Sequence, residues 1–341
     1  MSAPGEAKDA RAPDAPLLEI EGLRTHFFTR AGVVKAVDDV SFTVRKGEVV
    51  GLVGESGSGK SMTGYSIMGL IDPPGRIVDG KIRLNGRDLR SLSSEDLRQL
   101  RGNRIAMIFQ DPMMTLNPVL SIAVQMVETI LAHEKVSRDA ALMRSRAALV
   151  KVGIPSPDER LKAYPHQFSG GMRQRVAIAI ALLNNPDLII ADEPTTALDV
   201  TIQGQILFEM QKLTSETGAA MIWITHDLSV VAGLADRVCV MYAGRIVEQG
   251  SVFEVIGAPR HPYTQGLLDS VPSRSARGAL LKQVPGMAPS VLDLAPGCAF
   301  RERCNQATAK CGEMPEMTAI GDPASGQIVR CHHPIHWEAV A

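Results

Sequence analysis

The sequence has little of the features that mark a membrane-spanning, nucleic-acid-binding or secreted protein. Only 4% of the 341 residues are aromatic, and the formal net charge is −1. No apolar run approaches the ~20 residues that a membrane-spanning helix needs. Without a basic excess, a nucleic-acid partner is not favoured. Hydrophobic residues make up 45% of the chain, which is enough for one large and one smaller domain, or for two domains.

The chain also lacks a secretion signal and, until its end, clustered cysteines. Residues 1–16 are rich in Ala, Pro and charge, so we expect a disordered leader and a cytoplasmic chain. Cysteines in a cytosolic chain rarely form disulfides. Cys239 stands alone in an alternating, strand-like run and is predicted to be a small core residue. The other four cysteines fall within the last 44 residues (341 − 298 + 1).

The most informative feature is a glycine-rich loop that fits the pattern G-x-x-x-x-G-K-[ST] at every fixed position. It follows an apolar run, residues 49–53, and precedes a predicted helix. Glycines let backbone N–H groups turn toward the β- and γ-phosphates of a nucleotide, and the helix N-terminus adds positive potential. Lys60 would reach the terminal phosphates, and the Ser61 hydroxyl would ligate Mg²⁺. The loop consists of Gly54, Glu55, Ser56, Gly57, Ser58, Gly59, Lys60 and Ser61.

Two acids follow a second apolar strand, residues 188–191. Asp192 at the strand tip can hold Mg²⁺, directly or through water. Glu193 would then lie beside the γ-phosphate and polarise the attacking water. Alone, this pattern fits an ordinary strand with an acidic turn about as well; beside a phosphate loop it favours the nucleotide site.

Three weaker signals complete the set. Ser169, Gly170 and Gly171 open a helix, which alone indicates a plain capped helix but can also bind an anion. His226 ends a strand, a place where histidine is more often a surface or capping residue, yet here it could contact the γ-phosphate. Gln110, at the end of another strand, is equally weak by itself.

The order of elements predicts an α/β fold. Strands are expected at 17–20, 33–37, 41–44, 80–86, 104–109, 188–191 and 219–225, and helices within 121–152 and at 169–183 and 201–217. Strands that alternate with helices indicate a largely parallel sheet, here joined by an antiparallel β subdomain and a helical insert at about 111–168. Periodicity weakens after about residue 250, where Pro and Gly become frequent. We therefore expect a nucleotide-binding domain over 17–255 and a small loop-rich domain over 256–341.

Taken together, residues 17–255 resemble the ATP-binding subunit of an ABC transporter. The matching order is loop 54–61, Gln110, signature 168–172, acids 192–193, Asp199 and His226. The signature departs from the family's Leu-Ser-Gly-Gly-Gln at Phe168 and Met172, but its phosphate-binding residues are intact.

The resemblance implies roles for further residues. Gln110 would join Ser61 and Asp192 at Mg²⁺, and Asp199 would belong to the nucleotide site. An aromatic residue after the first strand would stack on adenine; here this is Phe27 or Phe28, unless the ring simply packs in the core. Two cassettes would face head to tail, so that Ser169 of one meets the nucleotide of the other.

The end of the chain resembles the oligopeptide and dipeptide importer ATPases in particular. The segment 258–268 contains His261-Pro262-Tyr263, and the cysteine-bearing tail follows. The resemblance implies a second ATPase subunit, two transmembrane permeases and an extracytoplasmic peptide-binding protein as partners. It also implies a peripheral position on the cytoplasmic face of the membrane.

The four late cysteines, Cys298, Cys304, Cys311 and Cys331, have the spacing C-x5-C-x6-C-x19-C. Four thiolates can hold a [4Fe–4S] cluster or a tetrahedral Zn²⁺. The gaps are wider than those of common zinc sites, and the family resemblance also favours the cluster. Zn²⁺, also with His332 or His333, and unliganded thiols remain alternatives. A metal centre would have a structural role, since a short loop-rich tail has little core of its own.

Other uses of such an ATPase are less compatible with the sequence. Versions that act on DNA separate the phosphate loop from the signature by a long coiled coil, whereas here 109 residues (169 − 60) without heptads separate them. Ribosome-associated versions carry two cassettes in one chain, and this chain has one. An importer of nickel or another small solute would use the same motor, and the sequence hardly separates it from a peptide importer.

Overall fold

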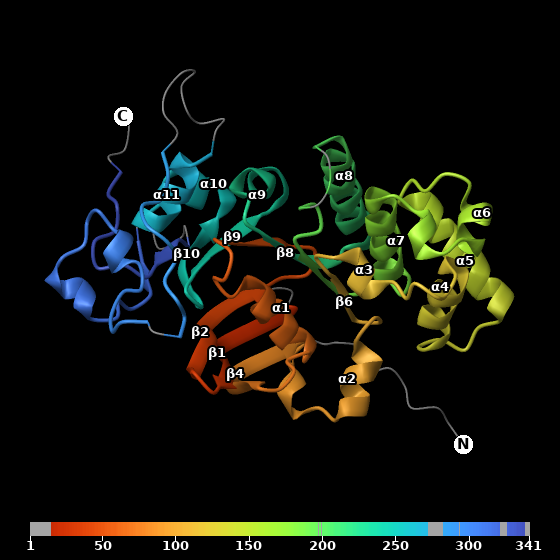
Figure 1. The fold of residues 1–341 in the computed structure, drawn as a ribbon, viewed down its shortest axis with the longest axis horizontal. Coiled ribbons are helices and arrows are strands. Elements are labelled where there is room, and N and C mark those ends of the chain that lie inside the picture. Colours follow the sequence, from red (N-terminus) through yellow and green to blue (C-terminus); the bar gives the residue numbers. More distant parts are fainter. Residues whose placement is uncertain are drawn as a thin grey trace.

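The computed structural model describes residues 15–196, 198, 200–271, 282–292, 294–320 and 326–337, and Figure 1 shows their arrangement. A large sheet has the strand order β11-β12-β10-β9-β3-β8-β7-β6. Neighbours from β9 to β6 are parallel, as predicted, while β10 and β12 extend the sheet in antiparallel pairs. The strand bounds are β3 Val49–Val53, β6 Ile105–Ile108, β7 Leu188–Asp192, β8 Ala220–Thr225, β9 Arg237–Tyr242, β10 Arg245–Ser251, β11 Thr318–Ala319 and β12 Ile328–Val329.

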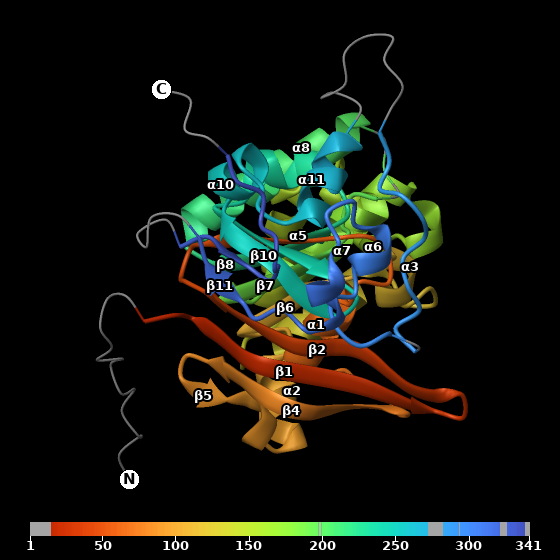
Figure 2. The same cartoon turned by 90° about the vertical axis from the view of Figure 1, so that its left-hand side faces the viewer.

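A second, antiparallel sheet has the order β2-β1-β4-β5 and lies beneath the first in Figure 2. Its strands are β1 Leu18–Thr29, β2 Gly32–Val44, β4 Gly75–Leu84 and β5 Arg87–Asp88. The separate strands predicted at 33–37 and 41–44 are one strand, because the pairing with β1 continues past Asp39, whose left-handed φ of 66° accompanies an irregular register.

Helix α1 (Lys60–Met68) contacts β1, β2 and β7 and so lies between the two sheets. Apolar residues of β1, β2, β3 and α1 form one core, and a second core joins the other face of the large sheet to the helical insert. The insert forms one end of the molecule in Figure 1. The remaining helices of this part are α2 Ser94–Leu100, α3 Pro112–Thr115, α4 Ile122–Leu131, α5 Arg138–Lys151, α6 Pro157–Lys162, α7 Gly170–Leu182, α8 Val200–Thr217 and α9 Leu228–Leu234.

The C-terminal segment lies at the opposite end from the insert (Figure 1). It begins with two helices that the sequence did not predict, α10 (Val252–Gly257) and α11 (Pro262–Asp269). Short 3-10 turns and extended segments follow, and β12 pairs with β10 of the large sheet. None of the helices in the described ranges is long and apolar enough to cross a membrane.

Candidate active site

The phosphate loop links β3 to α1, and its backbone requires glycine. Gly54 and Gly59 have φ angles of +153° and +101°. A Cβ atom would lie 2.2 Å from the Met241 carbonyl oxygen at Gly54 and 2.3 Å from the Ala36 carbonyl oxygen at Gly59. No side chain caps the N-terminus of α1, so its free amide groups suit an anion.

Lys60 begins α1 and is buried, with 4% of its surface exposed. Its Nζ donates to the carbonyl oxygens of Gly54 at 2.8 Å and Glu55 at 2.9 Å. Burial lowers the pKa of Lys60, while the nearby Glu193, Asp192 and Glu55 oppose that shift. The loop therefore holds the ammonium group by its own carbonyls, in place for an anionic ligand.

Ser61 and Asp192 meet across the site. The Ser61 hydroxyl donates to Asp192 Oδ1 at 2.9 Å, and Asp192 is almost fully buried at the end of β7. Burial raises the pKa of Asp192, with a smaller contribution from Glu193, while Ser61 and Lys60 lower it. A hydroxyl and a buried carboxylate form an oxygen donor pair that fits Mg²⁺, which would also reduce the cost of burying the carboxylate.

Glu193 gathers the other predicted catalytic groups around one carboxylate oxygen, Oε2. Thr196 Oγ1 donates to it at 2.8 Å, Gln110 Nε2 lies 3.4 Å away and His226 Nδ1 also lies 3.4 Å away. Glu193 has a left-handed φ of 44°, a strained conformation for a residue that is not glycine. Its N–H donates to the Ile224 carbonyl at 2.9 Å, which holds it at the tip of β7.

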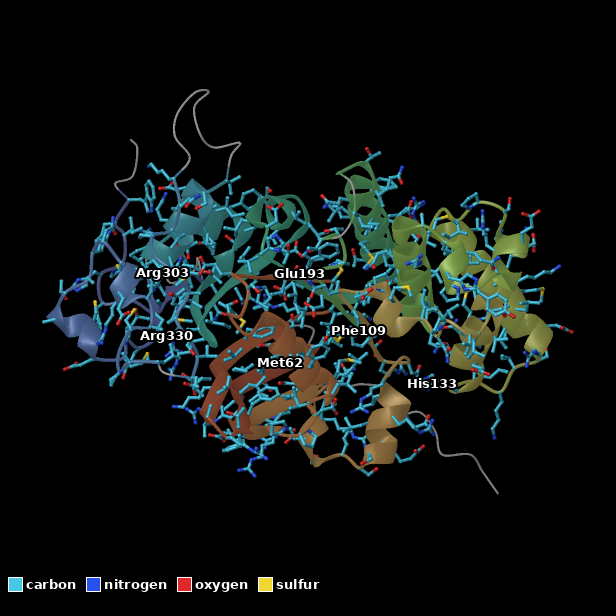
Figure 3. All side chains as sticks on the ribbon, in the orientation of Figure 1. Met62, Phe109, His133, Glu193, Arg303 and Arg330 are labelled. Carbon is cyan, nitrogen blue, oxygen red and sulfur yellow. The ribbon has the colours of Figure 1, made fainter. Side chains whose placement is uncertain are left out.

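Lys60, Ser61 and Glu193 line one cleft of about 720 Å³ together with Gln110 and His226, and Glu193 marks its place near the centre of the molecule in Figure 3. The structure thus brings together residues that lie far apart in the sequence. The lining residues are Ala36, Glu55, Ser56, Gly57, Gly59, Lys60, Ser61, Met62, Gln110, Glu193, His226, Leu267 and Val291.

Other predicted site residues lie away from this cleft. Ser169 caps α7, accepting a hydrogen bond from the Met172 N–H at 3.3 Å, and is exposed beside Gly170. Phe27 lies in β1, where it is paired with Gly75 of the neighbouring strand β4. Neither the signature nor Phe27 lines the cleft in the described residues, and Asp199 lies outside those residues.

The sequence reasoning missed several residues of the site. Thr196 holds Glu193, and its position three residues after the acid was the available signal. Leu267 and Val291 bring the C-terminal segment into the cleft wall. Arg303 and Tyr263 contact Glu55 of the phosphate loop. These contacts join residues 248 and 208 positions apart, and no local sequence pattern predicts contacts over such separations.

The four late cysteines lie in the C-terminal segment and are free thiols. Burial raises the pKa of Cys298, Cys304 and Cys331, the last to about 11, and the other three thiols lie close enough to Cys331 to raise it further. Backbone N–H groups donate to the sulfur atoms of Cys304 and Cys331 at 3.4 and 3.3 Å. In the described ranges, however, no group of three or more His, Cys, Asp or Glu residues is arranged to hold a metal ion, contrary to the four-thiolate site predicted from spacing.

Comparison with known families divides the chain in two. Residues 37–196 match the family described as ABC transporter. Residues 247–311 match the family described as oligopeptide/dipeptide transporter, C-terminal region. The first range contains the phosphate loop, signature and acids, and the second contains α10, α11 and three of the late cysteines.

Named relatives cover nearly the whole chain. The oligopeptide transport ATP-binding protein OppD of Salmonella typhimurium is 46% identical over 335 residues, 98% of this chain and 99% of that protein. The dipeptide transport ATP-binding protein DppD of Escherichia coli is 46% identical over 320 residues, 94% and 97%. The dipeptide protein DppD of Bacillus subtilis is 50% identical over 308 residues, 90% and 92%.

Solved structures agree with the fold. A bacterial ABC transporter cassette solved as a dimer superposes with a TM-score of 0.63 at 26% identity, covering 69% of this chain and 98% of the cassette. CbiO1 of Clostridium perfringens, part of the ABC transporter complex CbiONQ, gives 0.60 at 28% identity, covering 71% and 91%. With the family match and near-full-length relatives, the chain belongs to the ATP-hydrolysing cassettes of ABC transporters and carries the C-terminal region of the oligopeptide/dipeptide branch.

Proposed function

We propose that the chain is the ATP-hydrolysing motor of an importer that takes up oligopeptides or dipeptides across the cytoplasmic membrane, acting from its cytoplasmic face. The observation that carries this proposal is that two features occur together in one chain. One is a cleft lined by Lys60, Ser61 and Glu193, with Asp192 bonded to Ser61. The other is the C-terminal region shared with oligopeptide and dipeptide transporters, which supplies part of the wall of that cleft.

The geometry supports distinct roles for the residues of the site. The phosphate loop and Lys60 bind the triphosphate, and Ser61 and Asp192 would hold Mg²⁺, which screens charge on the phosphates. Glu193 accepts a proton from the attacking water. Gln110, His226 and Thr196 surround Glu193 and orient its carboxylate.

The proposal extends to the partners of the chain: a second ABC cassette, two transmembrane permeases and an extracytoplasmic peptide-binding protein. Ser169 and Gly170 are exposed and face no nucleotide cleft of their own chain. An exposed, capped helix N-terminus with adjacent glycines suits the phosphates of a nucleotide held by another cassette. ATP would then be buried between the two cassettes, and its hydrolysis would open the pair.

The test is affinity purification of the tagged chain from gently solubilised native membranes, followed by identification of the bound proteins. Recovery of a second cassette, two multi-span permeases and a peptide-binding protein supports the proposal. Recovery of the same assembly with a nickel-binding or other solute-binding protein would support the alternative substrate. Recovery of soluble partners alone, such as ribosomes or DNA-repair proteins, would overturn the transport function and leave the ATPase intact.

We further propose that the four late cysteines bind a structural [4Fe–4S] cluster. The N–H donors to the Cys304 and Cys331 sulfur atoms support it, because such bonds stabilise thiolates. Their present arrangement does not match a closed metal site, so binding would have to draw the sulfur atoms together. Anaerobic purification with iron, sulfide and zinc analysis tests this. Iron and sulfide in cluster ratio support it, zinc favours the alternative, and a colourless metal-free protein would refute both.

A further inference from the structure

The C-terminal segment contacts the phosphate loop at Glu55. Arg303 donates two hydrogen bonds to the Glu55 carboxylate, from Nη1 to Oε2 at 2.7 Å and from Nη2 to Oε1 at 2.9 Å. The Glu55 backbone N–H donates to the Tyr263 hydroxyl at 2.8 Å. Both the side chain and the backbone of this one loop residue are therefore tied to parts of the chain more than 200 positions away.

Arg303 is itself firmly held. Its side chain is only 7% exposed, and Glu55 is 28% exposed. Arg303 Nε donates to the Pro285 carbonyl at 2.7 Å, and Nη1 also lies 3.2 Å from the Tyr242 hydroxyl. A bidentate pair between a guanidinium and a carboxylate is among the stronger hydrogen-bonded contacts in proteins. Figure 3 marks Arg303 on the C-terminal segment.

The contact bears on nucleotide binding through two links. The Glu55 carbonyl accepts from Lys60 Nζ at 2.9 Å, so a shift of Glu55 moves a contact of the lysine that binds phosphate. In addition, Glu55 lines the cleft, and without Arg303 its carboxylate would face the triphosphate as an unpaired negative charge. Loss of Arg303 would therefore loosen the loop and repel its ligand at the same time.

We propose that Arg303 is a positioning residue for ATP binding: through Glu55 it holds the phosphate loop in the conformation that receives the triphosphate, and Tyr263 secures the same residue by its backbone. Arg303 immediately precedes Cys304. The segment that carries the late cysteines is thus the one that fixes the loop, which gives the C-terminal region a role in the ATPase cycle of its own cassette.

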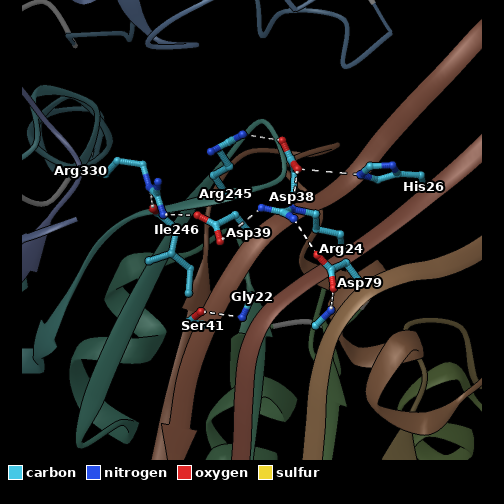
Figure 4. A network of polar contacts seen from close by, with 11 residues as sticks. Gly22, Arg24, His26, Asp38, Asp39, Ser41, Asp79, Arg245, Ile246 and Arg330 are labelled. Carbon is cyan, nitrogen blue, oxygen red and sulfur yellow. Dashed lines mark hydrogen bonds and ion pairs between the residues drawn. The ribbon is translucent and has the colours of Figure 1, made fainter. Parts of the chain in front are cut away.

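Arg330 provides a matched control. It also belongs to the C-terminal segment and also pairs with a carboxylate of the core, donating from Nη2 to Asp39 Oδ2 at 3.0 Å and from Nε to the Ile246 carbonyl at 3.2 Å. Figure 4 shows this pair within a network of charges at β1, β2 and β10. Neither Arg330 nor Asp39 lines the nucleotide cleft, so R330Q loosens the segment without touching the loop.

The experiment measures the Kd of the full-length chain for ATP bearing a fluorescent methylanthraniloyl group, with thermal melting to check folding. We expect R303Q to raise Kd about tenfold, which corresponds to about 1.4 kcal/mol. R303K keeps the charge but cannot make the bidentate contact, so its Kd should lie between those of R303Q and wild type. R330Q should lower the melting temperature and leave Kd unchanged. In the assembled ATPase, R303Q should raise KM for ATP while kcat stays within about twofold.

A second variant covers the case in which R303Q does not fold. Y263F removes only the hydroxyl that accepts the Glu55 N–H and keeps the ring against Tyr242 and Phe300. Loss of one neutral hydrogen bond should raise Kd about threefold. A wild-type Kd in folded R303Q, or in Y263F where R303Q fails to fold, would overturn the proposal. An equal rise in R330Q would also overturn it, because the effect would then be a general loosening of the segment.

Discussion

At the scale of single residues, Glu193 is the residue that we propose as the base for ATP hydrolysis. Its left-handed backbone and its three partners, Thr196, Gln110 and His226, fix one carboxylate oxygen in the cleft. Strain at such a position persists only because the surrounding contacts over-determine it. The sequence analysis predicted Gln110 and His226 as catalytic residues and missed Thr196, whose only signal is its position three residues after Glu193.

The variant E193Q should bind ATP as tightly as wild type and lose at least about a hundredfold in turnover. The amide keeps the size and the hydrogen bond from Thr196 but cannot accept the proton of the attacking water. Fluorescent-nucleotide binding and phosphate release measure the two effects separately. E216Q, an exposed acid outside the cleft, is the control. Retained turnover in E193Q would place the base elsewhere.

His261 gives the molecule a defined response to acid. It is buried at the start of α11, where its Nδ1 accepts the Tyr263 N–H at 3.0 Å. Burial lowers the pKa of His261 to about 3, against an ordinary value near 6.5. Between about pH 3 and pH 6.5, His261 is therefore protonated in the unfolded chain and neutral in the folded chain. The contribution of His261 is complete above pH 6.5 and is lost progressively as the pH falls toward 3.

Substitution by asparagine tests this response, because asparagine is a favoured cap and does not titrate. From pH 7.5 to pH 5 the wild-type chain should lose about 2 kcal/mol of stability through His261, and H261N should lose correspondingly less. Denaturant unfolding at the two pH values measures the difference. Burial raises the pKa of Glu248, which accepts the Arg260 and His261 N–H groups, but this opposite contribution is common to both proteins. Equal pH dependence in the two proteins would contradict the assignment.

At the scale of elements, an aromatic cluster attaches the C-terminal segment to β9. Phe300 is 3% exposed and packs edge-on against Tyr242 at a centroid distance of 5.3 Å, and against Tyr263 at 5.4 Å. These rings come from β9, α11 and the stretch between Cys298 and Cys304. Ring pairs in this geometry add to the free energy of burial itself.

The variant F300A should therefore destabilise the chain by about 3–5 kcal/mol, since the ring leaves both lost apolar burial and a cavity. Phe253 offers a matched control, because it is 85% exposed on α10 and F253A should change stability by less than about 0.5 kcal/mol. Chemical denaturation of both variants measures the difference. Similar small effects would show that the cluster does not hold the segment to the core.

The elements differ in how well the sequence predicts them. Strands β3, β7 and β8 are short apolar runs that end in functional residues, and the sequence placed each within a residue or two. Strand β12 has two residues and carries no periodic signal. Its pairing with β10 depends on a contact across about 80 positions, which local propensity cannot show. The Arg303–Glu55 pair escaped prediction for the same reason.

At the scale of the whole molecule, the ATP cleft and the signature are separate surfaces. Loop 54–61 contacts the C-terminal segment through Glu55, whereas Ser169 caps α7, which packs against α5 of the helical insert. Figure 1 shows α7 on the side of the insert and the C-terminal segment at the opposite end. This separation supports the proposal that a single chain binds nucleotide with one surface and offers the other to the nucleotide of a second cassette. The sequence contained both motifs, but their separation in space follows from the fold.

This separation predicts an asymmetric phenotype for S169R. Nucleotide binding to the isolated chain should match wild type, because Ser169 does not line its own cleft. ATP turnover by the assembled transporter should fall at least about tenfold, since a long cation would block the helix N-terminus that we propose to face the partner's phosphates. H166R, with the same charge added at an exposed position three residues earlier, should retain turnover. If S169R instead weakened binding to the isolated chain, the signature would serve its own nucleotide and the head-to-tail arrangement would be wrong.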